Sequence, residues 1–265
     1  MPRTFKRIFI GAIYLVIFGA IIGGTYLYKT KPTCFDGRQN GQDEGVDCGT
    51  LACGKACSVA IKEIKIQTAE FVTAKDGISE AVMEIYNPNV GQAIADGAHT
   101  LIFEDFSGNE TKRFEGNKFY IFPGQTKLIV RGNIPGIPAG SKMRIELESI
   151  NWRETGDLPN AAFAVRQEAL LPGIQSSYEA VVSNNSDYDF KKVDVAVVVR
   201  DSSGNLVTAV TTNIQTFLAR TNRSFKVSWP FELPADAVVR THVETNLLDD
   251  SNFIKSAGRT GEFPR

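Results

Sequence analysis

The sequence predicts an all-β protein of two tandem antiparallel β-sandwiches, which follow an N-terminal transmembrane helix and a disulfide-rich loop segment. Three observations support this prediction. Residues 8–28 carry no charged side chain, and all 4 cysteines lie between residues 34 and 57. The rest of the chain repeats itself, with the short, turn-separated apolar runs that are typical of strands.

Residues 8–28, IFIGAIYLVIFGAIIGGTYLY, are long enough to cross a membrane. At ~1.5 Å of rise per residue, such a helix spans the ~30 Å hydrocarbon layer. Residues 1–7 contain three basic side chains, whereas Lys29 and Lys31 follow the apolar run. Because basic residues favour the cytoplasmic side, we expect a single-pass protein with residues 1–7 in the cytoplasm and the C-terminal domains outside it.

Two cleavable signals fit this segment less well than a permanent anchor. A secretory signal peptide has a shorter apolar region, of ~7–15 residues, and ends in an A-x-A site, which GGTYLYKT does not offer. Nor does Cys34 follow the small, apolar segment of a lipoprotein signal. Within the helix, Gly19 and Gly23 form a GxxxG pattern that would let two helices approach closely and form a homo-oligomer, although glycine is also simply common in membrane helices.

Residues 29–58 contain Cys34, Cys48, Cys53 and Cys57, spaced C-x13-C-x4-C-x3-C. An even number of cysteines in an oxidising compartment predicts two disulfides, without fixing which cysteines pair. Zinc ribbons and thioredoxin-like redox centres both need CxxC pairs, which this segment lacks, and no histidine lies nearby to complete a mixed zinc site.

A calcium loop is the alternative that the acidic residues of this segment raise. Asp36, Asn40, Glu44 and Asp47 match places 1, 5, 9 and 12 of a calcium-binding loop, and Gly41 matches the turn glycine. A basic residue occupies the third place, and the final ligand is an aspartate in place of the longer glutamate. We therefore favour tight turns with solvated acids, and expect no metal or other cofactor.

The same segment resembles a short cysteine motif that many secreted and surface proteins of bacteria contain, often beside other extracellular modules. The resemblance implies an extracellular location and no particular activity. The matching residues are Cys34, Asp36, Gly37, Asn40, Gly41, Glu44, Gly45, Val46, Asp47, Cys48 and Gly49.

The remaining residues form two similar units. Asp105, Gly108 and Asn109 return as Asp201, Gly204 and Asn205, at one offset of 96 residues. We expect domains at 59–152 and 161–248, a short polar linker at 153–160, and a disordered tail at 249–265. Alternating apolar and polar residues predict strands at 61–69, 81–86, 99–105, 118–122, 126–132 and 143–150 in the first unit, and at 162–170, 178–182, 193–201, 205–212, 215–219, 224–231 and 238–245 in the second.

The second unit, with VVSNNSDYDFKKVDVAVVVRDSSGNLV, resembles FxLYD-type domains. The first, with EIYNPN and LIFEDFSGN, is similar to these and to LEA14-like, water-stress-type domains. The five-residue FxLYD signature itself differs, because residues 197–201 are VVVRD and residues 101–105 are LIFED. The resemblance implies an immunoglobulin-like β-sandwich in each unit and no recognised catalytic set.

No residue pattern predicts catalysis. His99 and His242 lie in predicted strands of different domains, where a structural histidine with satisfied hydrogen bonds is the expected role. The acid pairs at 104–105 and 249–250 do not form a site either, because neighbouring strand residues point to opposite faces and the second pair lies in a predicted loop. We expect a protein that is not an enzyme.

The charge of the chain also limits its partners. A formal net charge of −1, without a basic patch, excludes the usual nucleic-acid footprint. Trp152 and Trp229 each end a strand pattern and are expected in the cores. The leading hypothesis is a membrane-anchored extracytoplasmic protein that binds or scaffolds an unidentified protein or other component of the cell envelope. The alternative is a structural subunit of a surface appendage that assembles through its helix.

Overall fold

The computed structural model describes residues 3–30, 34, 37, 39, 46–49, 53–55, 57, 60–74 and 77–254. The chain divides into two compact units, Met1–Ala60 and Ile61–Arg265. We call the second unit the head and describe each unit by itself.

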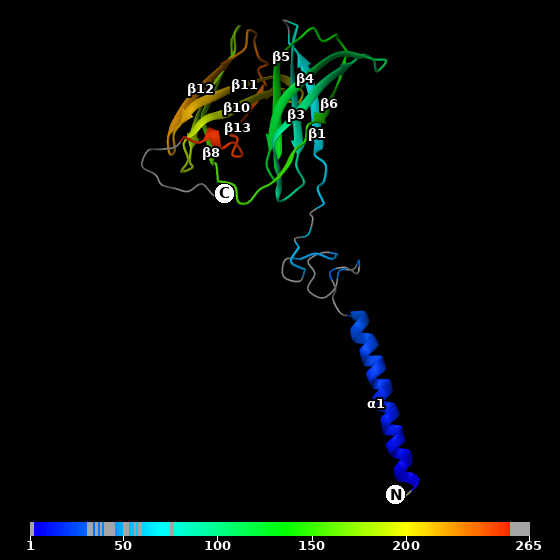
Figure 1. Ribbon diagram of the computed structural model, residues 1–265. Coiled ribbons are helices and arrows are strands. Elements are labelled where there is room, and N and C mark those ends of the chain that lie inside the picture. Colours follow the sequence, from blue (N-terminus) through cyan, green and yellow to red (C-terminus); the bar gives the residue numbers. More distant parts are fainter. Residues whose placement is uncertain are drawn as a thin grey trace. The chain divides into compact units, whose positions relative to one another are not determined.

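The first unit begins with helix α1, Arg3–Thr30 (Figure 1). Its stretch Phe5–Tyr26 is long and apolar enough to cross a membrane, a test that a signal sequence also passes. The apolar side chains of this stretch are exposed on every side of the helix. The hydroxyl of Thr25 donates to the carbonyl of Ile21 at 2.8 Å, four residues earlier in the same helix.

The first sandwich of the head contains two antiparallel sheets, with strand orders β1-β2-β5 and β4-β3-β6. A short seventh strand pairs with the start of β3. The strands are β1 (Lys65–Thr73), β2 (Ile78–Tyr86), β3 (Gln92–Glu104), β4 (Glu110–Ile121), β5 (Thr126–Pro135), β6 (Lys142–Glu148) and β7 (Trp152–Glu154).

The second sandwich repeats this topology, with sheets β8-β9-β12 and β11-β10-β13 (Figure 1). Its strands are β8 (Phe163–Leu171), β9 (Ser177–Asn184), β10 (Phe190–Arg200), β11 (Leu206–Phe217), β12 (Asn222–Ser228) and β13 (Val238–Glu244). The predicted fold class, two tandem antiparallel β-sandwiches, is therefore confirmed.

Each sandwich has its own core between its two sheets. In the first, Met83, Leu101 and Phe103 are fully buried, and Trp152 packs against them. In the second, the core includes Tyr178, Val195, Phe217 and the buried Trp229. Large apolar side chains of this kind each stabilise a fold by roughly 1.5–3 kcal/mol when buried. Both tryptophans lie where the sequence predicts them.

The sequence repeat includes two buried asparagines that hold equivalent loops. Asn87 donates its amide to the carbonyl oxygens of Gln92 and Phe122 at 2.7 and 2.9 Å. Asn184 donates to those of Tyr188 and Leu218 at 2.9 and 3.2 Å. Each side-chain oxygen also accepts the backbone N–H two residues ahead. These contacts satisfy loop carbonyls that would otherwise be buried without partners.

The repeated Asp-x-x-Gly-Asn sequences are hairpin turns, as predicted. Asp105 accepts the backbone N–H of Asn109 at 2.9 Å, and Asp201 accepts that of Asn205 at 2.8 Å. These bonds hold the pKa of both aspartates below its ordinary value. Gly108 and Gly204 take φ values of 81° and 86°, which a side chain would disfavour.

Three predicted boundaries are wrong. The separate strands predicted at 118–122 and 215–219 are the ends of β4 and β11, because the polar first half of β4 and the polar residues 211–213 in the middle of β11 interrupt the apolar pattern. Arg153 and Glu154, predicted in the linker, lie in β7 because they pair with β3.

A further correction concerns the tail, whose first residues fold onto the second sandwich. Residues 250–252 form a 3₁₀ helix, and Phe253 is buried and bridges to Phe190. Asn252 accepts the N–H of Lys192 at 3.0 Å and donates to Thr245 at 2.7 Å. The prediction of disorder is wrong for 249–254, and residues 255–265 lie outside the described ones.

The two sandwiches pack against each other through outward-facing side chains. Val82 on β2 is buried with Val198 on β10 and Ala209 on β11. The carboxylate of Glu80 accepts hydrogen bonds from the hydroxyl of Thr208 at 2.5 Å and the N–H of Ala209 at 2.7 Å. An ion pair between Glu70 and Arg200 joins β1 to β10. Leu128, Val130 and Leu206 pack around the apolar part of the contact. The head is thus one compact unit.

Candidate functional site: the interdomain cleft and the His99 crevice

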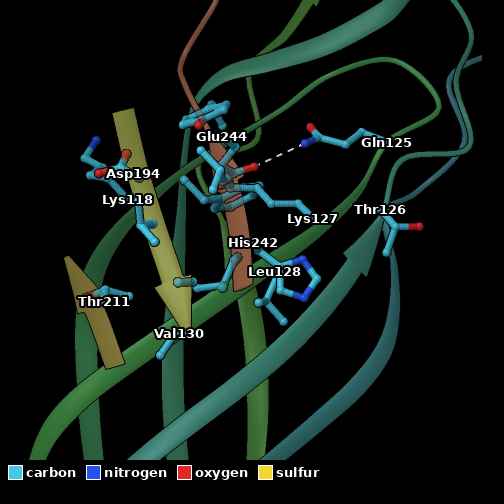
Figure 2. A pocket seen from close by; sticks show the side chains of 16 residues that line it. Lys118, Gln125, Thr126, Lys127, Leu128, Val130, Asp194, Thr211, His242 and Glu244 are labelled. Atoms are coloured by element: carbon cyan, nitrogen blue, oxygen red, sulfur yellow. Dashed lines mark hydrogen bonds and ion pairs between the residues drawn. The ribbon is translucent and has the colours of Figure 1, made fainter. Parts of the chain in front are cut away.

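A cleft of about 410 Å³ lies between the sandwiches (Figure 2). We call it the interdomain cleft. The ends of β4 and β5 and the loop between them form one wall, and the outward face of β10, β11 and β13 forms the other. Its polar lining comprises Lys118, Tyr120, Gln125, Thr126 and Lys127 from the first sandwich and Asp194, Thr211, His242 and Glu244 from the second.

Lys127 is the central residue of this cleft. Its side chain is only 6% exposed, and its Nζ forms an ion pair with Glu244. The same Nζ lies 3.6 Å from the centroid of the Tyr120 ring, a cation–π contact. Burial lowers the pKa of Lys127, and the negative charge of Glu244 opposes that shift. Gln125 donates to the other oxygen of Glu244 at 3.3 Å, which fixes the carboxylate (Figure 2).

Tyr120 keeps its proton in this environment. Burial, followed by the negative charges of Glu244 and Asp194, raises the pKa of its hydroxyl well above the ordinary value. The cleft therefore contains two carboxylates and a paired ammonium group, beside a protonated phenol whose oxygen is buried. Such a set hydrogen-bonds a polar ligand in a fixed orientation.

A second cavity, of about 380 Å³, opens between β4 and β5 of the first sandwich. We call it the His99 crevice. It shares Lys118, Ile129 and Val130 with the interdomain cleft, so the two cavities adjoin. Its full lining is His99, Gly116, Asn117, Lys118, Ile129, Val130 and Arg131.

His99 lies in a strand, as predicted, but its hydrogen bonds are not satisfied. The side chain is 2% exposed, and neither ring nitrogen has a partner within the described part of the chain. Burial, and then the positive charge of Arg131, lowers its pKa to about 4. The expectation of a satisfied strand histidine is therefore wrong, because His99 points inward where no polar group meets it. His242 is exposed and lines the interdomain cleft instead.

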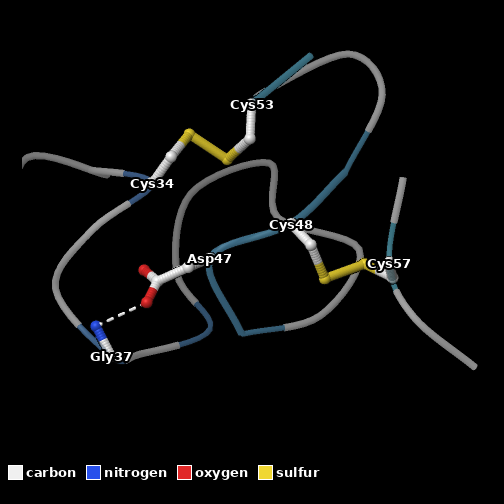
Figure 3. The surroundings of a disulfide bond; sticks show 6 residues. All are labelled: Cys34, Gly37, Asp47, Cys48, Cys53 and Cys57. Carbon is white, nitrogen blue, oxygen red and sulfur yellow. Dashed lines mark hydrogen bonds between the residues drawn. A yellow bond between two sulfur atoms is a disulfide. The ribbon is translucent and has the colours of Figure 1, made fainter. Parts of the chain in front are cut away.

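The structure pairs all four cysteines as two disulfides (Figure 3). Cys34 joins Cys53 with Cα atoms 5.5 Å apart, and Cys48 joins Cys57 with Cα atoms 4.9 Å apart. The two bridges interleave along the chain, since Cys48 lies inside the loop that the first bridge closes. No thiolate is left to bind zinc or carry out redox exchange.

Asp47, the last of the four calcium candidates, braces this loop. Its carboxylate accepts the backbone N–H of Gly37 at 2.8 Å (Figure 3). Asp36, Asn40 and Glu44 lie outside the described residues. Among the residues that the structure describes, no group of three metal-binding side chains occurs. The calcium arrangement stays an untested hypothesis.

The other sequence candidates lie apart from the cavities. Gly19 and Gly23 leave an open face on α1, where an added Cβ would meet nothing within 4 Å. Glu104 forms an ion pair with Arg144, and Asp249 accepts the N–H of Ser251 at 2.9 Å at the start of the 3₁₀ helix. The acid pairs at 104–105 and 249–250 thus have structural partners.

The sequence patterns above do not predict the Lys127–Glu244 pair, although β5 carries one signal for it. In β5, Lys127, Ile129 and Arg131 alternate on the face that turns inward. Charged residues at two of three inward positions are unusual and indicate either an edge that resists strand pairing or a polar cavity. The sequence could not supply the partner, because Glu244 lies 117 residues away.

Comparison with known proteins adds no family. No family model matches the sequence, and no curated protein is significantly similar to it. A transglutaminase from red sea bream is 11% identical over 75% of this chain and 31% of its own, with a TM-score of 0.23. A β-glucuronidase from Parabacteroides merdae is 11% identical over 65% of this chain and 29% of its own, with a TM-score of 0.19. The chain spans less than a third of either structure, and likenesses at these scores carry no functional argument.

Proposed function

We propose that the protein is a membrane-anchored, non-catalytic binding or scaffolding protein of the cell envelope. In this proposal α1 stays in the membrane as a permanent anchor with residues 1–7 in the cytoplasm, and the head acts outside it. The exposed apolar surface of α1 supports the anchor, since such a surface is stable in lipid. The two disulfides support an oxidising location.

The observation that carries a binding role is the interdomain cleft. Its walls come from both sandwiches, which are held together by Lys127 and Glu244 at the cleft and by Glu80 beneath it. A site of this kind is formed before its ligand arrives, so little binding energy is lost in arranging it. The head therefore offers one fixed polar surface in place of two independently moving domains.

The chemistry of the lining favours a polar ligand. Asp194 and Glu244 of the second sandwich can accept hydrogen bonds, while Thr211 on the same wall and Gln125 and Lys118 on the opposite wall supply donors. An extended segment of a protein or another envelope polymer, with many donors and acceptors, fits this mixture. The near-neutral chain gives no reason to expect nucleic acid.

Site-specific photocrosslinking on intact cells tests the binding role. A crosslinking amino acid replaces the exposed Thr211 at the cleft, and a control replaces the exposed Arg223 on β12, which does not line the cleft. We expect a discrete adduct from position 211 that position 223 does not give. The same pattern of adducts from both positions, or none from position 211, would contradict the proposal.

Protease treatment of sealed cells tests the orientation separately. We expect added protease to degrade the head of intact cells and to leave a short membrane-embedded fragment that contains α1. A head that is cut only after lysis would mean that the orientation is reversed. A mature protein that lacks α1 altogether would replace the anchor with a cleaved signal.

A further inference from the structure

We propose that the His99 crevice is a binding site for a small anion, namely a carboxylate or phosphate group held between Arg131 and His99. The site goes beyond the proposed function, because it depends neither on the anchor nor on a ligand in the interdomain cleft.

The first argument is the unpartnered imidazole. His99 is 2% exposed and lines the crevice, and both of its ring nitrogens lack a hydrogen-bond partner among the described residues. Buried polar groups without a partner are rare in folded proteins and call for a specific explanation. The ring is neutral at physiological pH, so one nitrogen carries a hydrogen that can be donated to a ligand.

The second argument is the guanidinium group beside it. Arg131 is half-buried on the inward face of β5 and forms no ion pair with any described carboxylate. The Cζ atom of its guanidinium group lies 5.9 Å from the centroid of the Phe114 ring. A guanidinium group presents a planar fork of donors that matches carboxylate and phosphate oxygens. An oxygen anion in the crevice would satisfy Arg131 and His99 together.

The third argument is the irregular backbone that lines the crevice. The pairing of β3 with β4 shifts register between His99 and Leu101, opposite a bulge at Gly116, where φ is 71°. Asn117 fastens this bulge, since its amide donates to the carbonyls of His99 at 3.3 Å and Phe114 at 3.0 Å. Bulges of this kind often occur next to functional sites, where they redirect side chains.

The charges around the crevice also favour an anion. No acidic residue lines it, whereas Lys118 and Arg131 do. Lys118 is already paired with Asp96 at 2.9 Å, and Glu115 of β4 with Arg113 at 3.8 Å, so Arg131 is the lining cation that has no ion pair among the described residues. Protection of the β5 edge against strand pairing would explain Arg131 alone. It would not explain why the ring nitrogens of His99 have no hydrogen-bond partner among the described residues.

Titration of the full-length protein in detergent tests the site, with inorganic phosphate and acetate as separate probes. Nuclear magnetic resonance of the ¹⁵N-labelled imidazoles follows His99 and His242 in one sample. We expect a saturable shift of the His99 signal and none of His242, which lines the other cavity. The probe that saturates at the lower concentration identifies phosphate or carboxylate as the preferred group.

Variants make the test specific. Arg131→Gln keeps much of the side-chain length and should weaken binding about tenfold or more, because the charge-assisted bonds are lost. Arg131→Lys keeps the charge without the fork and should restore part of the affinity. His242→Asn is the matched control and should bind like the unaltered protein.

A linear, non-saturating response of His99, or unchanged affinity in Arg131→Gln, would overturn the proposal. Neither result would affect the crosslinking test at position 211.

Discussion

Lys127 of the first sandwich and Glu244 of the second, 117 residues apart in sequence, form a partly buried ion pair that joins the two domains. This pair sits beneath the ring of Tyr120 and is fixed further by Gln125. Its position at the centre of the interdomain cleft makes it both a structural contact and part of the candidate site.

Glu244→Gln should destabilise the protein by about 2 kcal/mol or more, because it leaves the ammonium group of Lys127 buried without a counter-charge. Lys127→Met in the same chain should recover part of that loss, since it removes the unpaired charge. Chemical denaturation of the two single variants and the double variant measures the coupling. Strictly additive losses would show that the two side chains do not interact.

His99 should make the protein less stable in mild acid. Its pKa is about 4 in the folded protein against an ordinary value of 6.5, so the folded state binds fewer protons than the unfolded chain. The contribution of neutral His99 to the free energy of unfolding is therefore fully present above pH 6.5 and is lost as the pH falls toward about 4.

The size of this effect should be on the order of 2–3 kcal/mol over that interval. Urea denaturation at several pH values measures it, with His99→Phe as the comparison. The difference in unfolding free energy between the two proteins should change with pH in this window. Parallel pH profiles would rule out His99 as the cause.

Phe253→Ala should destabilise the second sandwich by about 3 kcal/mol, because it removes a large aromatic side chain from a packed core. Its ring lies 5.4 Å from that of Phe190. Ser251→Ala, an exposed position two residues earlier, is the matched control and should have little effect. Thermal unfolding compares the two variants, and equal melting temperatures would mean that the 3₁₀ segment contributes nothing to the fold.

The disulfides should stabilise the first unit without contributing to the unfolding free energy of the head. Peptide mapping without reduction should recover the linkages Cys34–Cys53 and Cys48–Cys57 and no free thiol. Trp152 and Trp229 are the only tryptophans and both lie in the head, so their fluorescence reports its unfolding alone. A reductant should leave that transition unchanged, and a lower melting temperature would link the two units.

Self-association of the helix should depend on Gly19 and Gly23. Replacing both glycines with leucine would keep backbones apart, and we expect a membrane reporter of helix association to lose its signal. The same change at Gly11 and Gly24 is a control for added bulk. If the reporter signal survives at positions 19 and 23, the assembly hypothesis has no remaining support.

The sequence predicted the architecture well because strand alternation, turn residues and the repeat all report local geometry. It did not predict that the sandwiches pack together, although residues 128–130 of β5 are apolar on both faces. Such a run indicates that both faces of the strand are buried, but it does not identify the segment that packs on the outer face. The polar residues 249–251 similarly concealed Phe253, whose burial depends on a distant strand. The cavities, which require side chains from several strands, could not be derived from one chain segment at a time.

The contact between the sandwiches joins unlike faces, since Val82 on β2 meets Val198 on β10 and Ala209 on β11. The first sandwich uses the outer face of β2 and β5, where Val82 pairs across the strands with Val130. On the equivalent face of the second sandwich, Val181 faces Ser224 and Glu179 faces Lys226. This face of the second sandwich is therefore polar where its counterpart on the first sandwich is apolar, so the same contact cannot be repeated through it with the same apolar packing.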